Sequence, residues 1–104
     1  MDAVKVIWTT LAISQRNKIF EYWNKRNKSI LYSKRLNLLI YEKIDLLQLN
    51  PFAGEEIEDF HARILHFEKY GLVYKIEKQN IYILSFWDSR QNPKKLLEIL
   101  KNKK

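Results

Sequence analysis

The stretch FHARILHFEKYGLVYKIEKQNIYILSFWDSR, residues 60–90, decides the fold of this chain. It contains three runs rich in β-branched and aromatic residues, at 60–67, 71–76 and 81–87. Short polar connectors separate the runs: Lys69-Tyr70 with Gly71 forms the first break, and residues 77–80 form the second. Runs of this composition joined by short connectors are typical of an antiparallel meander, so we expect three neighbouring strands here.

The residues before this stretch predict a strand and a helical hairpin. Residues 5–8 form a short apolar run that favours an opening strand. Apolar residues then recur at helical spacing from residue 11 to about 25, and again from residue 30 to about 49, with Ser29 as the expected N-cap of the second helix. The segment Asn50-Pro-Phe-Ala-Gly54 ends that helix, because proline cannot continue it and glycine opens a turn.

A short helix is expected after Arg90, because Pro93 suits a first helical turn and apolar residues follow it at 96, 97, 99 and 100. The resulting order is strand, two helices, three strands and a short helix. This order predicts an α+β fold with the hairpin packed on one face of a small, largely antiparallel sheet. A chain of 104 residues can build one modest core, so we expect a single domain over residues 1–104.

Charge favours an acidic partner. Lys and Arg number 19 against 12 acidic residues, for a net charge of +7. Residues 15–35 hold seven basic side chains and one acid, Glu21, whereas an acidic cluster (Glu55, Glu56, Glu58, Asp59) precedes the predicted sheet. The partner could be a nucleic acid, another protein or an anionic surface.

The sequence favours a soluble, cytoplasmic protein with no membrane partner. It contains no cysteine, which excludes disulfides and thiolate metal sites and is usual in a reducing compartment. No apolar run approaches the roughly 20 residues that span a bilayer. The first residues lack the basic start and apolar run of a signal peptide.

Few residues suggest chemistry. His61 and His66 are five positions apart, so an extended strand would direct them to opposite faces, and we expect no metal site. No glycine-rich phosphate loop is present, and no cofactor is expected. Arg63 interrupts an apolar run, where a charge is costly to bury unless it is paired or faces a ligand. It could therefore pair with the acidic cluster or bind an anion, and Arg90 at the end of the last strand is a second candidate cation.

The chain resembles the RelE/ParE family of toxins from bacterial type II toxin–antitoxin modules, also known as plasmid stabilisation proteins. The residues that carry the resemblance extend over most of the chain and are Lys5-Val-Ile-Trp8 with Ala12, Leu49-Asn50-Pro51-x-x-Gly54, Arg63-x-Leu65, Tyr70-Gly-Leu-Val-Tyr74 and Ile81-x-Ile-Leu-Ser-Phe-Trp-Asp-Ser-Arg90. The family fold is a small sheet backed by an N-terminal helical hairpin. It agrees with the fold predicted above from the residues alone.

The resemblance implies a toxin, with two kinds of target. In the ribonuclease branch, basic residues on the sheet and at the end of the last strand bind mRNA, and Arg63 and Arg90 occupy matching places. His66 is the nearest acid/base candidate, but this chain lacks the tyrosine that usually follows the last arginine. The repeat of its apolar positions predicts a second helix of roughly twenty residues. A helix of this length resembles that of the gyrase-directed ParE branch.

We therefore expect a toxin that acts on DNA gyrase or another essential target. The alternative is a ribosome-dependent, metal-independent mRNA endoribonuclease with Arg63, His66 and Arg90 as catalytic residues. A non-toxic basic nucleic-acid-binding module would explain the charge alone. The resemblance also implies a cognate antitoxin, whose acidic amphipathic segment would bind the sheet and the hairpin, with Leu97 and Leu100 among the apolar contacts.

Overall fold

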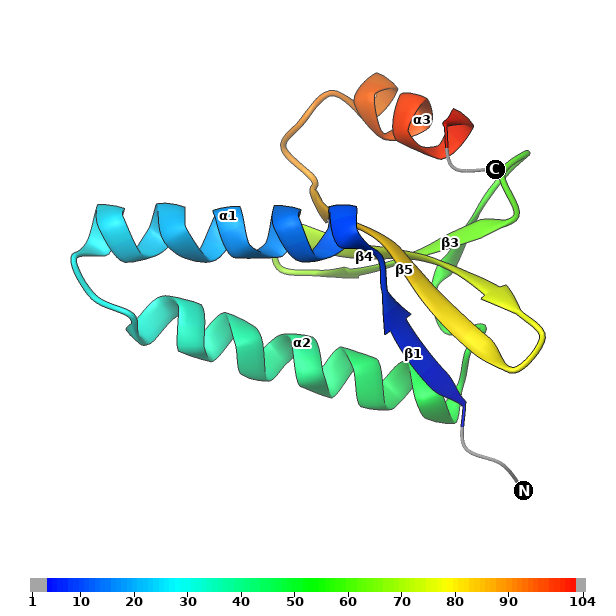
Figure 1. Cartoon of the computed structure of the whole chain (residues 1–104), viewed down its shortest axis with the longest axis horizontal. Coiled ribbons are helices and arrows are strands. Elements are labelled where there is room, and N and C mark those ends of the chain that lie inside the picture. The colour runs from blue at the N-terminus through cyan, green and yellow to red at the C-terminus, as the bar shows by residue number, and fades with distance from the viewer. Residues whose placement is uncertain (1–3, 103–104) are drawn as a thin grey trace.

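The computed structural model describes residues 4–102 of the chain (Figure 1). Its elements in chain order are β1 (Lys5–Trp8), α1 (Thr10–Asn27), α2 (Leu31–Leu49), β2 (Glu55–Ile57), β3 (Ala62–Phe67), β4 (Tyr70–Glu77), β5 (Asn80–Asp88) and α3 (Pro93–Lys101). This order confirms the predicted α+β class. No helix in the described part of the chain is long and apolar enough to cross a membrane.

The strands form one sheet in the order β1-β5-β4-β3-β2. β3, β4 and β5 are antiparallel neighbours, which confirms the predicted meander. β1 lies parallel to β5. Parallel strands cannot be joined by a short turn, and here the helical hairpin and the other strands lie between them in the chain. β2 was not predicted, since its residues Glu55-Glu-Ile57 lack the composition that marks a strand, and it forms by pairing with β3 at the sheet edge.

The turn between β3 and β4 lies earlier than the sequence suggests. Glu68 and Lys69 form it, with Glu68 in the left-handed region at φ 53°, whereas Tyr70 and Gly71 are the first residues of β4. Gly71 is thus not a turn residue. A Cβ atom there would lie 2.7 Å from the Cδ1 atom of Ile64, so this glycine makes room for a packed neighbour.

α1 begins at a capped turn that also binds the sheet. The hydroxyl of Thr9 accepts a hydrogen bond from the backbone N–H of Ala12 at 3.3 Å and donates one to the carbonyl of Ile83 at 2.8 Å. The helix ends at Asn27, about two residues beyond the predicted end, and Lys28 then adopts a left-handed conformation with φ 50°. This conformation turns the chain back toward α2.

α2 begins one residue later than predicted. Ile30 occupies the N-cap position and makes no side-chain capping bond, so Ser29 is not the N-cap. The Ser29 hydroxyl nevertheless accepts a hydrogen bond from the backbone N–H of Leu31 at 3.2 Å. The hydroxyl thus provides a partner for the N–H of the first helical residue, although Ser29 lies one position before the N-cap.

The sheet separates two apolar cores. The core beneath the hairpin contains Ala12, Leu36, Ile40, Leu47, Phe67, Tyr70, Leu72, Tyr74, Ile81, Ile83 and Phe86. The core beneath α3 contains Ala62, Ile64, Val73, Leu84, Trp87, Leu96 and Leu100. The hairpin thus covers one face of the sheet, as predicted, and α3 covers the other.

β5 contains a β-bulge before the residues that lead to Arg90. The pairing between β4 and β5 shifts register at Leu84, which has no partner on β4. The side-chain carbonyl of Gln15 on α1 then accepts two hydrogen bonds of 2.9 Å, from the Ser85 hydroxyl and from the backbone N–H of Phe86. The last part of β5 is thereby attached to α1.

Candidate functional site

The helical hairpin presents a basic surface. Its basic side chains between residues 15 and 35 are Arg16, Lys18, Lys25, Arg26, Lys28, Lys34 and Arg35, and all except the half-buried Arg16 are exposed. Within residues 4–102, the ion pairs involve only Arg63, Lys75 and Arg90 among the basic residues. The charge of the hairpin is therefore free to attract an acidic partner.

A small pocket lies where this basic surface meets the end of β5. Its volume is about 230 Å³, and its lining residues are Lys18, Ile19, Tyr22, Trp23, Tyr70, Asp88 and Arg90. The Trp23 indole N–H donates a hydrogen bond of 2.8 Å to the hydroxyl of the fully buried Tyr70, which fixes the pocket floor. Tyr22 packs edge-on against Trp23 with ring centroids 5.0 Å apart and remains exposed.

Arg90 is held at the mouth of this pocket by Asp88. Its Nε and Nη2 atoms bind the two carboxylate oxygens of Asp88 at 2.9 and 2.7 Å, and its backbone N–H binds Oδ1 at 3.0 Å. Hydrogen bonding to the Arg90 side chain lowers the pKa of Asp88 from its ordinary value. The pair is thus ionised at neutral pH, with two of the guanidinium nitrogens bound to the carboxylate.

Arg63 has a structural role in the loop between α2 and β2. Its Nη1 atom donates a hydrogen bond of 2.8 Å to the carbonyl of Gly54, and Nη2 lies 3.6 Å from a carboxylate oxygen of Glu56. The guanidinium carbon lies 5.0 Å from the centre of the Phe52 ring. Arg63 therefore pairs with the acidic cluster, one of the two alternatives that the sequence leaves open.

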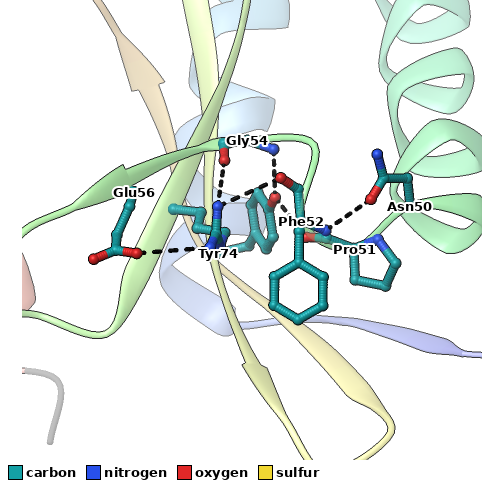
Figure 2. A network of polar contacts seen from close by, with 7 residues as sticks. Asn50, Pro51, Phe52, Gly54, Glu56 and Tyr74 are labelled. Atoms are coloured by element: carbon teal, nitrogen blue, oxygen red, sulfur yellow. Dashed lines mark hydrogen bonds and ion pairs between the residues drawn. The ribbon is translucent and has the colours of Figure 1, made fainter.

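Tyr74 completes this loop from the hairpin side of the sheet. Figure 2 shows its hydroxyl between two backbone groups: it accepts from the N–H of Gly54 and donates to the carbonyl of Pro51, both at 2.8 Å. Burial raises the pKa of Tyr74 despite the opposing effect of Gly54 and Arg63. The phenol is thus neutral at physiological pH and keeps the proton that it donates.

Of the two histidines, His66 lies apart from Arg63, whereas His61 lines a pocket together with Arg63 and Glu56. His66 is exposed and follows Leu65 on β3, whose pairing with β4 is regular from Arg63 to Phe67. Because successive side chains of a strand alternate between its faces, Arg63 lies on the hairpin side and His66 on the α3 side. His61 is an exposed turn residue with φ 53°, just before β3.

Arg63 and Arg90 also lie in separate places. Arg63 pairs with Tyr74 across the sheet, whereas Asp88, the partner of Arg90, pairs with Tyr70. These pairings are four residues apart along β4, which corresponds to about 13 Å at the usual rise of a strand. The three predicted catalytic residues are therefore not brought together. Among the described residues, no group of three His, Cys, Asp or Glu side chains could hold a metal ion.

The predicted antitoxin contacts on α3 differ in exposure. Leu97 is exposed, whereas Leu100 is buried against the sheet with Leu96. Only Leu97 is accessible to a partner while α3 stays in place. The role of both residues in antitoxin binding remains a prediction.

The sequence analysis missed the aromatic part of the pocket. The residue types alone predict that Tyr22 and Trp23 are core residues, whereas Tyr22 is 53% exposed. Nothing in the sequence places Tyr22 beside Arg90, which lies far along the chain.

Comparison with known proteins agrees with the observed fold. Residues 6–93 match the model of a family described as the ParE toxin of the type II toxin–antitoxin system parDE. A solved structure described as a chromosomal ParDE toxin–antitoxin system from P. aeruginosa is similar in fold, with a TM-score of 0.70. The similarity extends over 83% of this chain and 96% of that one at 20% sequence identity. A search of curated protein sequences gives no match. Because the family model accounts for most of its length, the chain belongs to the ParE family of toxins and is the toxin component of a type II toxin–antitoxin module.

Proposed function

We propose that this toxin arrests bacterial growth by acting on DNA gyrase rather than by cutting mRNA. The observation that carries the proposal is the separation of Arg63, His66 and Arg90. A metal-free ribonuclease needs an acid, a base and a phosphate clamp within hydrogen-bonding reach of one scissile phosphate. Here Arg63 is committed to the 50–54 loop, and His66 lies on the opposite face of the sheet.

A toxin that acts by binding needs a surface rather than a catalytic set. The basic hairpin and the adjoining pocket provide one, with an exposed tyrosine beside an arginine. Tyr and Arg are enriched among residues that dominate binding energy at protein interfaces. Gyrase is a cytoplasmic enzyme, so the proposal places the action of the toxin in the cytoplasm.

The test compares the two targets in one set of cells. After induction of the chain, we expect intact mRNA by primer extension, together with a DNA-damage response. The purified chain should inhibit gyrase supercoiling in vitro. Codon-phased mRNA cuts that disappear in the Arg90→Ala variant would instead establish the ribonuclease.

We also infer where the antitoxin binds. An acidic amphipathic segment would approach the basic hairpin and place apolar side chains in the pocket at Tyr22. Leu97 would be a further contact on α3, and Leu100 would contribute if α3 is displaced. Opposite charges speed the encounter, while buried apolar contacts slow dissociation. Co-purification of the chain with the product of the adjacent gene tests this inference, and absence of binding at micromolar concentrations contradicts it.

A further inference from the structure

The outer face of α2 carries a stripe of exposed leucines, interrupted by Glu42, that no other described element covers. Leu31, Leu38 and Leu49 lie on it with exposed fractions of 74%, 65% and 87%. Leu31 and Leu49 bound the helix and are five full turns apart at 3.6 residues per turn, so their side chains align. The buried residues Leu36, Ile40 and Leu47 lie on the opposite side. Figure 1 shows α2 at the edge of the molecule, with no further element beyond it.

The charges beside this stripe are segregated along the helix. Lys34 and Arg35 lie in its N-terminal half, whereas Glu42 and Asp45 lie in its C-terminal half, together with the half-buried Lys43. The other four residues are exposed, and none of the five forms an ion pair within residues 4–102. An occupant of this face must therefore present acidic groups to the first half and basic groups to the second.

We propose that this face binds the same face of a second copy of the chain, with the two α2 helices antiparallel. A twofold axis near Ile40 would place Leu31 beside Leu49 of the second copy and Arg35 beside Asp45 of the second copy. Symmetry repeats each contact, which gives a self-complementary interface. The same axis places Leu38 beside Glu42 of the second copy.

The charge pattern selects this arrangement over a parallel one. In a parallel pair, Arg35 would face Arg35 and Asp45 would face Asp45, and like charges at equivalent positions repel. Only the antiparallel orientation joins the basic half of one helix to the acidic half of the other. A single pair of helices buries a small area, so we expect a dimer that dissociates on dilution.

Sedimentation equilibrium of the purified full-length chain tests the proposal. At the highest concentrations the mass should approach twice the 12.7 kDa of the monomer. Arg35→Asp and Asp45→Arg should each reduce it to the monomer value, because each variant creates two like-charge contacts. A mixture of the two variants should recover the dimer, since both contacts then join opposite charges again. Lys95→Asp, an exposed substitution on α3 with the same change of charge as Arg35→Asp, should leave the dimer intact.

Several results would overturn the proposal. One is a monomer at every concentration, and another is a dimer that both charge variants retain. The Leu38→Glu variant provides a further test, and circular dichroism verifies that this exposed substitution leaves the fold intact. If Leu38→Glu abolishes antitoxin binding without changing the mass of the free chain, the stripe is an antitoxin site and the second copy is excluded.

Discussion

The hydroxyl of Tyr74 lies 2.8 Å from the backbone nitrogen of Gly54, and the two residues fix the loop that joins the hairpin to the sheet. Tyr74 is fully buried, so its hydrogen bonds to Gly54 and Pro51 replace water for both groups. Arg63 binds the carbonyl of Gly54 from the other side. Tyr74 and Arg63 thus hold residues 50–54, the asparagine-proline-x-x-glycine motif, in a fixed conformation.

Removal of the Tyr74 hydroxyl should destabilise the protein. Tyr74→Phe leaves the N–H of Gly54 and the carbonyl of Pro51 without their partner, and a buried unsatisfied group costs about 1–3 kcal/mol. Urea denaturation should show a lower midpoint with an unchanged slope. Tyr82→Phe is the matched control, because its hydroxyl makes only a 3.4 Å contact with Asn80. Equal midpoints for the two variants would show that the hydrogen bonds of Tyr74 do not stabilise the protein.

Gly54 should tolerate a methyl group less well than Gly71. A Cβ atom at Gly54 would lie 2.6 Å from the Tyr74 hydroxyl oxygen, which two hydrogen bonds hold in place. A Cβ atom at Gly71 would lie 2.7 and 2.8 Å from the Cδ1 and Cγ1 atoms of Ile64, an apolar side chain that no hydrogen bond holds in place. Gly54→Ala should therefore lower the free energy of unfolding more than Gly71→Ala, by a difference of about 1 kcal/mol or more. The reverse order would show that Tyr74 can move aside.

The sequence predicted the strands and helices of this fold well, because period and composition are local properties. The predicted strand over residues 60–67 is confirmed as β3, whose alternation places Arg63 and His66 on opposite faces. β2 escaped prediction, since Glu55 and Glu56 become strand residues only by pairing with β3. Such a strand is specified by tertiary contact rather than by its own composition.

The site was less predictable because its contacts join distant parts of the chain. Arg63 binds backbone carbonyls of the 50–54 loop, and side-chain composition does not reveal where those carbonyls point. The pocket joins Tyr22 of α1 to Arg90 after β5, through a bulge at Leu84 that carries no sequence signal. Residue types can nominate such positions, but only the register of the sheet decides which of them meet.

The contribution of Asp88 to stability should depend on pH. Its pKa is lowered in the folded state, chiefly by the Arg90 side chain, so its stabilising effect is present above the ordinary carboxyl pKa of 3.8 and is lost as pH falls through the lower folded value. Asp88→Asn should therefore lower the urea midpoint at pH 7. The difference from the parent chain should begin to shrink below pH 3.8 and vanish below the lower folded pKa.

A surface ion pair provides the control for Asp88. Glu77→Gln removes the exposed contact of 3.0 Å with Lys75 and should change stability at pH 7 by less than about 0.5 kcal/mol. A constant difference between Asp88→Asn and the parent chain across the acidic range would show that the carboxylate charge contributes nothing.

Tyr22 should matter for binding and not for folding. Its exposed fraction is 53%, and it lines the pocket beside Arg90, whereas Tyr41 on α2 is 61% exposed and lies outside this pocket. Truncation of an exposed side chain changes stability by about 0.5 kcal/mol or less, so both alanine variants should unfold at the parent midpoint. If the antitoxin places an apolar side chain in the pocket, Tyr22→Ala should weaken its binding by tenfold or more, because loss of an aromatic anchor costs about 2 kcal/mol. Tyr41→Ala should bind as the parent chain does. Calorimetric titration of both variants with the product of the adjacent gene measures the difference, and equal affinities would place the antitoxin elsewhere on the toxin.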